Sequence, residues 1–329
     1  MSERILGIHH VTAITGDAQQ NVDFYTGVLG LRLVKVTVNY DDPGSYHLYY
    51  GDDLGRPGTA LTFFAWPGAA SLPRERRRGT RLATATAYAV PEGALDFWRD
   101  RLGAANVPSE ESEIFGEKTL AFEDGDGMAL ELIESPDAAQ RPAWTQGGAD
   151  EKYALRGFHR VQLTEDNAER TARFLGDVME WRAADSEGER QRFVIGDGSQ
   201  PGSRVDVLAR PDLQRGAGAP SGSGGPGIVH HVAWRVPDDA AQALWLAKVR
   251  ALGGNVSPIM ERNYFRSIYF REPGGVLFEI ATDTPGFTAD ESAAELGTHL
   301  KLPGNLEAAR GEIERIVPPL RLPGGGQLP

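Results

Sequence analysis

Cysteine is absent from the 329-residue sequence, and this absence limits the chemistry that the chain can perform. Without thiols the protein has no disulfides, no thiolate zinc site, no iron–sulfur cluster and no cysteine nucleophile. Any metal must therefore be bound by nitrogen and oxygen atoms.

Long apolar runs and basic charge are also scarce. No apolar segment approaches the roughly 18 residues that suggest a membrane span, and the N-terminus lacks a basic stretch followed by an apolar one. Lysine and arginine number 34 against 46 aspartate and glutamate residues, which gives a formal net charge of −12. This acidic balance argues against nucleic acid as the main partner. We expect a cytoplasmic protein with no membrane partner.

A repeated order of elements runs through the chain. Hydrophobic residues make up 40% of the sequence, and their periodicity predicts a strand, a helix and three further strands in each of four segments. In the first segment the helix begins after Asp17, a good N-cap, and ends at Gly30, while residues 42–44 are expected to form a turn. The four segments, called modules below, span residues 5–66, 82–135, 155–210 and 228–282.

The repeat predicts the fold class and the domain organisation. A sheet of four strands cannot bury both faces alone, so we expect an α+β fold in which four βαβββ modules pair into two curved mixed-sheet sandwiches. The expected order is an N-terminal domain over residues 1–135, a linker over 136–154, a C-terminal domain over 155–285 and a tail over 286–329. Asn305 is predicted to cap a helix in the tail, and Pro318 and Pro319 to stop it.

Two His-His-Val phrases supply the candidate chemistry. His9-His10-Val11 opens the first module and His230-His231-Val232 opens the fourth. Each phrase begins an alternating apolar run, so each pair of histidines is predicted to lie on a strand. In the last strand of the fourth module, Glu279 stands between Phe278 and Ile280, where a buried carboxylate is unfavourable unless it is paired or bound to a metal.

Comparing the modules in register selects the metal ligands. Alignment on the first-strand valine places these residues at one equivalent position: His10, Ala85, Arg160 and His231. The equivalent residues of the last strands are near Thr62, Glu131, Asp206 and Glu279. Only the first and fourth modules together collect two imidazoles and a carboxylate, namely His10, His231 and Glu279. Two histidines and one carboxylate are typical of non-haem Fe(II) sites. Modules two and three are expected to form a partner sandwich without metal.

Other polar residues have simpler interpretations. His47, His159 and His299 are single histidines, which are usually packed or surface residues. Glu131 lies between two leucines without a histidine at the equivalent position and is interpreted as structural. The basic cluster of residues 74–78 is interpreted as a solvated loop, with a role over a binding site as the alternative.

The sequence resembles the vicinal oxygen chelate superfamily, whose paired βαβββ modules surround a divalent metal. Within it the chain is similar to the ring-cleaving dioxygenases that act on para-hydroquinones, the dichlorohydroquinone 1,2-dioxygenase group. The similar segments cover residues 7–12 (GIHHVT), 21–31 (NVDFYTGVLGL), 46–64 (YHLYYGDDLGRPGTALTFF), 229–233 (VHHVA) and 266–279 (RSIYFREPGGVLFE).

The resemblance implies an Fe(II)-dependent, extradiol-type enzyme, with Mn(II) as the alternative metal, that inserts O₂ into a hydroquinone or catechol ring next to a hydroxyl. It implies the same three ligands, His10, His231 and Glu279. It also implies catalytic roles around the metal for four residues: His9, His230, Arg262 and Tyr269. The expected partners are a small aromatic substrate and O₂, and the oligomeric state stays open, a homo-oligomer included.

Two alternatives remain at this stage. The same fold carries glyoxalase-like isomerases and transferases that use other metals, usually with a fourth protein ligand, and the first module offers no second carboxylate. The fold also carries non-catalytic binding proteins for aromatic compounds, which lack the ligands.

Overall fold

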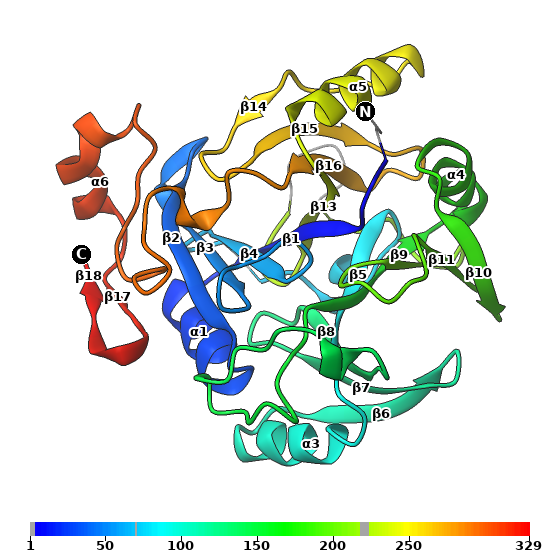
Figure 1. Ribbon diagram of the computed structural model, residues 1–329, viewed down its shortest axis with the longest axis horizontal. Coiled ribbons are helices and arrows are strands. Elements are labelled where there is room, and N and C mark those ends of the chain that lie inside the picture. The colour runs from blue at the N-terminus through cyan, green and yellow to red at the C-terminus, as the bar shows by residue number, and fades with distance from the viewer. Residues whose placement is uncertain (1–3, 70, 218–223) are drawn as a thin grey trace.

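Two large mixed sheets dominate the structure, a computed structural model that describes residues 4–69, 71–217 and 224–329 (Figure 1). Each sheet has eight strands, and both combine parallel and antiparallel pairs. The predicted α+β fold of repeated βαβββ modules is confirmed. Among the described residues no helix has the length and apolar character needed to cross a membrane.

The first sheet joins the first and fourth modules, as the register comparison predicted. At its centre β1 (Ile8–Thr15) pairs antiparallel with β13 (Val229–Val236). Its other strands are β2 (Arg32–Asn39), β3 (Asp42–Gly51), β4 (Ala60–Ala65), β14 (Met260–Glu261), β15 (Arg266–Arg271) and β16 (Leu277–Thr282). The strand order is β14-β15-β16-β13-β1-β4-β3-β2, so β14 and β2 are the two edges.

The second sheet joins the second and third modules through β5 (Leu82–Val90) and β9 (Phe158–Glu165). Its other strands are β6 (Ser109–Ile114), β7 (Glu117–Glu123), β8 (Ala129–Glu134), β10 (Arg182–Glu187), β11 (Arg190–Val194) and β12 (Arg204–Ala209). Each sheet thus takes strands from both halves of the chain. The division into an N-terminal and a C-terminal domain stays a prediction.

Strand pairing confirms the alignment of the modules. In the first sheet Thr12 lies opposite His231, and in the second sheet Ala87 lies opposite Arg160. On the last strands, Glu279 pairs with Ala233, two residues after His231, and Asp206 pairs with Gln162, two residues after Arg160. The two sheets therefore present equivalent positions at their centres.

Each module carries its helix where the apolar periodicity predicted one. The helical segments are α1 (Ala18–Val22) continued by a π-helical turn (Asp23–Val28), α3 (Leu95–Ala104), α4 (Ala168–Arg173) continued by a second π-helical turn (Phe174–Val178), and α5 (Asp239–Ala251). The Asp17 side chain accepts hydrogen bonds from the amides of Gln19 and Gln20, which confirms it as the N-cap of α1. Tyr25, Trp98 and Trp245 are the largest fully buried residues of these helices.

Two local predictions are wrong. Residues 42–44 do not form the turn, because Asp42 already begins β3, and the reversal falls at Tyr40 and Asp41. The tail helix α6 (Arg310–Ile316) begins five residues after Asn305 and has no side-chain cap, since a short 3₁₀ turn precedes it. Its end before Pro318 is as predicted.

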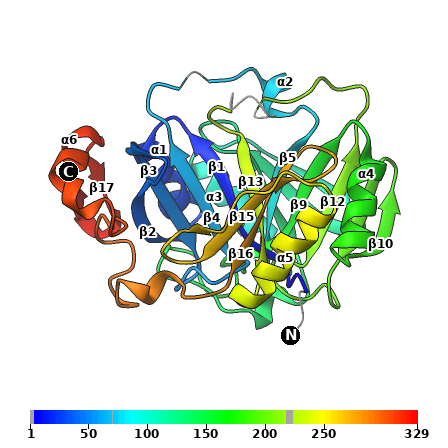
Figure 2. The same ribbon diagram turned by 90° about the horizontal axis from the view of Figure 1, so that it is seen from above.

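The tail packs beside the first sheet rather than extending a module. It includes α6 and a small hairpin of β17 (Leu320–Arg321) and β18 (Gln327–Leu328). These elements lie next to α1 and β3 at one side of the molecule (Figures 1 and 2). The Tyr46 hydroxyl donates to the carbonyl of Pro329 at 3.2 Å, which fixes the end of the tail against β3.

Glu165 in β9 gives a testable pH dependence of stability. Its side chain is fully buried, neither carboxylate oxygen has a hydrogen-bond partner among the described residues, and burial together with Glu272 raises its pKa to about 9. Because the pKa of Glu165 is higher in the folded state than in the unfolded state, the folded state holds its proton more tightly. This proton's contribution to the free energy of unfolding is complete below pH 4.5, the usual pKa, and is lost as the pH rises toward 9.

We therefore expect Glu165→Gln to raise the melting temperature at pH 8 by on the order of 5 °C and to leave it nearly unchanged at pH 4. Thermal denaturation across this pH range measures the effect. An equal shift at both pH values would contradict the ionisation argument.

Candidate metal centre

Bulges in the central strand pair bring each histidine pair together. The register of β1 against β13 shifts between Ile8 and His10, so His9 is an extra residue on β1. The register shifts again between Thr12 and Ala13, and there His230 is the extra residue on β13. A bulge turns neighbouring side chains away from strict alternation. The Nδ1 atoms of His9 and His10 are consequently 2.9 Å apart, and those of His230 and His231 are 2.8 Å apart.

Three ligand atoms converge at the centre of the first sheet. Nε2 of His231 lies 2.8 Å from Oε2 of Glu279, Nε2 of His10 lies 3.4 Å from the same oxygen, and the two nitrogens are 3.4 Å apart. All three side chains are buried. Among the described residues this is the one group of three or more histidine, aspartate or glutamate ligands close enough to share a metal ion.

The donor set fits a divalent metal. Bonds of about 2.1 Å to three mutually perpendicular ligands would separate the ligand atoms by about 3 Å, close to the observed spacing. Oε2 of Glu279 is buried, and no donor of the described residues is aligned with it. If each ligand histidine donates its Nδ1 proton to the neighbouring histidine, its Nε2 lone pair points to the same place as this oxygen. The site thus combines an orphaned buried anion with two free imidazole lone pairs.

Ser267 of β15 anchors the carboxylate. Its hydroxyl donates to Oε1 of Glu279 in a short hydrogen bond, which directs Oε2 toward the histidines. Burial alone would raise the pKa of Glu279, but positive charge on His10 and His231 would outweigh burial and hold this pKa well below its usual value. When both histidines are neutral, a bound cation would have to supply that charge. Burial and the adjacent His10 lower the pKa of His9, and burial and His231 lower that of His230 to about 3, so both are neutral near pH 7.

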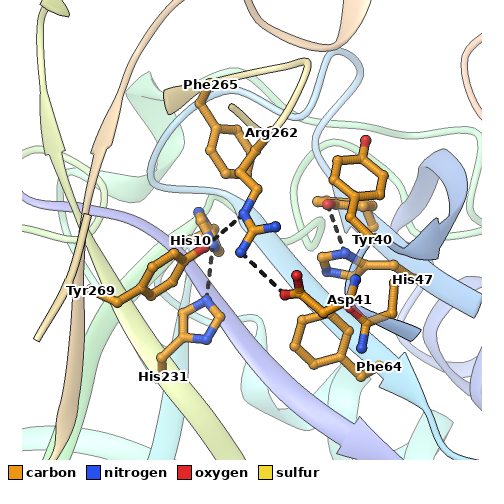
Figure 3. A pocket seen from close by; sticks show the side chains of 11 residues that line it. His10, Tyr40, Asp41, His47, Phe64, His231, Arg262, Phe265 and Tyr269 are labelled. Carbon is orange, nitrogen blue, oxygen red and sulfur yellow. Dashed lines mark hydrogen bonds and ion pairs between the residues drawn. The ribbon is translucent and has the colours of Figure 1, made fainter. Parts of the chain in front are cut away.

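A small pocket opens in front of the two candidate ligand histidines, His10 and His231 (Figure 3). Its free space measures about 30 Å³, which accommodates water but not an aromatic ring. The guanidinium group of Arg262 extends through it between Asp41 and Tyr269 (Figure 3). Nε of Arg262 donates to the Tyr269 hydroxyl at 3.3 Å, and Nη2 lies 3.5 Å from Oδ2 of Asp41. Arg262 thus occupies part of the space in front of the two histidines.

Aromatic side chains form the walls of the pocket. The ring of Phe265 lies 4.9 Å from that of His10, and the ring of Tyr269 lies 5.6 Å from that of His231. On the opposite side Phe64 packs 4.3 Å from His47. These walls would hold a flat apolar ligand with its edge toward the metal ligands.

The structure places all seven predicted site residues around one centre. His9 and His230 contact the ligand histidines, while Arg262 and Tyr269 line the pocket. Sequence reasoning missed the contribution of the first module to the pocket, above all Asp41, Phe64 and His47. The alternation of His47 and Tyr49 on one face of β3 was the signal available, but nothing in the sequence showed that this face meets Arg262.

His47 is a packed residue that also lines the pocket. Its Nδ1 atom lies 2.8 Å from the Tyr49 hydroxyl and its Nε2 atom 2.9 Å from Oγ1 of Thr62, which is 2.8 Å from Oγ1 of Thr12. Burial, together with His10 and His231, lowers its pKa well below 6.5. A neutral His47 thus connects the hydroxyl groups of Tyr49, Thr62 and Thr12 in one hydrogen-bonded row on the first sheet.

At the equivalent place in the second sheet a guanidinium group is found. Arg160 is fully buried, with Nη2 2.5 Å from Oε2 of Glu131 and Nε 3.1 Å from Oδ2 of Asp206. Arg192 also pairs with Asp206, at 2.8 Å. The positive charge that a metal would bring to the first sheet is supplied in the second by side chains.

The remaining candidates lie away from the pocket. Nε2 of His159 is 3.0 Å from Glu117, and burial lowers the His159 pKa to about 4. His299 is exposed. In the basic cluster, the short helix α2 (Arg74–Arg77) and Arg78 lie near Glu123, with Arg78 2.8 Å from its carboxylate.

Comparisons with known proteins identify the family of the chain. The family model described as the Glyoxalase/Bleomycin resistance protein/Dioxygenase superfamily matches residues 7–132 and 157–280. The Bacillus subtilis protein MhqO, provisionally named a ring-cleaving dioxygenase, is 42% identical over 323 residues, which cover 98% of this chain and 99% of that protein.

Two further relatives were found. Chlorohydroquinone/hydroquinone 1,2-dioxygenase of Sphingobium indicum is 38% identical over 321 residues, or 96% of this chain and 97% of that protein. The crystal structure of a provisionally named dioxygenase from Bacillus subtilis superposes with a TM-score of 0.89 at 41% identity, covering 98% of this chain and 99% of that chain.

Proposed function

The chain belongs to the Glyoxalase/Bleomycin resistance protein/Dioxygenase superfamily, and from this premise we propose that it is a metal-dependent ring-cleaving dioxygenase acting on a hydroquinone. The observation that carries the proposal is the cluster of His10, His231 and Glu279 at the end of an aromatic pocket. The names of relatives near 40% identity over almost the whole chain support ring cleavage.

The proposed metal is Fe(II), with Mn(II) as the alternative. Two imidazoles and one carboxylate suit either ion, and His10, His231 and Glu279 would hold it while leaving room for substrate and O₂. Fe(II) bound here would position the substrate oxygen and O₂ together and allow electron transfer between them. The absence of cysteine excludes thiolate ligation in this chain.

The residues around the ligands have distinct proposed roles. His9 and His230 are neutral, buried and within hydrogen-bond distance of the ligand histidines. If each accepts at Nδ1 from its ligand histidine, it carries its own proton on Nε2, which suits it to donate that proton toward the substrate. Burial and Glu279 raise the pKa of Tyr269, so its hydroxyl stays protonated and able to donate. Arg262, which remains charged, would stabilise a developing oxyanion.

The aromatic walls account for the proposed substrate class. A hydroquinone ring between Phe265 and Phe64 would place one hydroxyl at the metal ligands and the opposite one toward the residues from the first module, where His47, Tyr49 and Asp41 lie. A catechol would direct both hydroxyls to the metal ligands and bring no hydroxyl to His47, Tyr49 and Asp41. We therefore propose hydroquinone over catechol.

The alternatives of the same fold have less support. A glyoxalase-like isomerase or transferase would need a further protein ligand, and the group within the described residues comprises three. A non-catalytic binding protein would have no use for three buried ligands directed at one point. A zinc- or nickel-loaded protein without O₂ consumption would restore the first alternative.

Anaerobic loading with Fe(II), followed by O₂-uptake measurements with hydroquinone and with catechol, tests the proposal. We expect one iron per chain, one O₂ consumed per hydroquinone ring, and an open-chain acid as product. Iron-loaded protein that consumes no O₂ with either compound would refute ring cleavage, whereas turnover of catechol alone would overturn only the substrate assignment.

A further inference from the structure

A buried lysine joins the tail to the first sheet. Lys35 in β2 is fully buried, its ammonium group lies 2.6 Å from Oδ1 of Asp290, and it forms a second, short ion pair with Glu291. A buried ammonium is tolerated when several acceptors surround it. Both acceptors belong to the segment that follows the fourth module, so this segment is held against the edge strand of the first module.

Asp290 also contacts Tyr264, which lies next to the pocket residues in the chain. Its Oδ2 atom accepts a hydrogen bond from the Tyr264 hydroxyl at 3.0 Å, and the Lys35 ammonium lies 4.8 Å from the centre of the Tyr264 ring. The backbone amide of Gly286 donates to the carbonyl of Tyr264 at 2.8 Å. Tyr264 is therefore fixed by the tail at both its side chain and its backbone.

Tyr264 lies in the tight turn that carries two pocket residues. The Arg262 amide donates to the carbonyl of Phe265 at 3.0 Å, the Tyr264 amide donates to the carbonyl of Arg262 at 2.7 Å, and Asn263 has a φ of 62°. Arg262 and Phe265 point from this turn into the pocket, while Tyr264 points to the tail. Tyr264, Arg262 and Phe265 therefore share one short turn, whose backbone hydrogen bonds connect their positions.

Apolar contacts and backbone pairing complete the connection. Phe287 and Leu296 of the tail pack in one buried cluster with Tyr264 and Phe265. Further on, Leu300 forms a parallel bridge with Val36 of β2, and the Lys301 amide donates to the carbonyl of Val36 at 2.9 Å. Residues 286–301 therefore run from the turn before β15 to β2, the opposite edge of the first sheet (Figure 2).

We propose that residues 286–301 act as a strap that positions the Arg262–Phe265 turn over the metal ligands, with Lys35, Asp290 and Tyr264 as its positioning residues. None of the three lines the pocket. The proposal rests on the proposed function only in taking this pocket as the substrate site. In this proposal the tail contributes to substrate binding by positioning Arg262 and Phe265.

Tyr264→Phe is the sharpest test, because it removes one hydroxyl and keeps the ring. The matched control is Tyr46→Phe, which also removes a buried tyrosine hydroxyl bonded to the tail, but at Pro329, away from the turn. We expect Tyr264→Phe to keep stoichiometric iron, to raise KM for hydroquinone about tenfold and to lower kcat less, while Tyr46→Phe keeps both constants. Asp290→Asn should act in the same direction as Tyr264→Phe.

Two measurements separate the strap from the proposed function. Anaerobic calorimetric titration of the iron-loaded protein with hydroquinone measures binding without turnover, and hydrogen exchange of residues 262–265 measures the order of the turn without any ligand. Faster exchange in Tyr264→Phe but not in Tyr46→Phe supports the strap even if no ring is cleaved. Unchanged exchange, or equal losses in both variants, would overturn it.

Discussion

Replacing His231 by alanine is expected to abolish iron binding and to lower ring cleavage by at least about a thousandfold. His231 supplies one of three nitrogen and oxygen atoms that lie within 3.4 Å of one another, and its removal leaves two ligands. Glu279→Ala should have the same effect, because it removes the only negative charge among the three. Metal analysis after anaerobic Fe(II) loading and gel filtration measures the loss, and O₂ uptake measures the rate.

His230→Ala provides the contrast that assigns the roles within the pair. Nδ1 of His230 contacts Nδ1 of His231, on the side of the His231 ring away from the Nε2 atom that faces Glu279. At saturating Fe(II) this variant should keep its iron and lose about 10- to 100-fold in rate, as is usual for residues that orient a metal ligand. His159→Ala, at the equivalent of His9 in the second sheet, should keep both iron and rate. Iron retained by His231→Ala but lost by His230→Ala would reverse the assignment.

The sequence contained enough information to predict that His10, His231 and Glu279 come together, because three separate constraints agreed. The repeat placed two histidines and a carboxylate at equivalent strand positions, the apolar neighbours of Glu279 implied burial, and the lack of cysteine restricted the donors to nitrogen and oxygen. Strand pairing in the first sheet has the expected register. Periodicity is a strong signal when a whole module repeats it.

The pocket could not be predicted in the same way, because it depends on contacts between distant loops. Asp41 lies in a chain reversal that the sequence had predicted at residues 42–44, one to three positions further on. Its partner Arg262 lies 221 residues away in the sequence. No sequence pattern predicts the bulges at His9 and His230, although these bulges bring the side chains of each His-His pair into contact. Lys35 gave no signal either, since its two carboxylate partners lie in the tail, outside the repeats.

The two sheets solve one electrostatic problem differently. In the first sheet a buried carboxylate faces two imidazoles, and the proposed metal ion would supply the positive charge. In the second sheet the equivalent carboxylate, Asp206, faces the guanidinium groups of Arg160 and Arg192. A side-chain cation is covalently part of the chain, so the second centre contributes to folding without any ligand.

Arg160→Met should therefore destabilise the fold strongly. Methionine nearly preserves the volume but leaves Glu131 and the fully buried Asp206 short of one positive partner, a change that costs about 3 kcal/mol or more when a buried pair is broken. Arg173→Met is the matched control, since Arg173 pairs with Glu169 at the surface, where the same substitution should cost less than about 0.5 kcal/mol. Urea denaturation of the metal-free proteins measures both free energies of unfolding.

Iron binding of Arg160→Met at a temperature where it is folded provides the second half of this test. The ligands of the first sheet come from β1, β13 and β16, and none of these strands carries a residue paired with Arg160. The variant should consequently bind one iron per chain. Equal stability of Arg160→Met and Arg173→Met would show that the buried guanidinium contributes no net stability, and loss of iron in a folded Arg160→Met would show that the two centres are coupled. Retained iron with lowered stability would establish that one centre serves the fold and the other the chemistry.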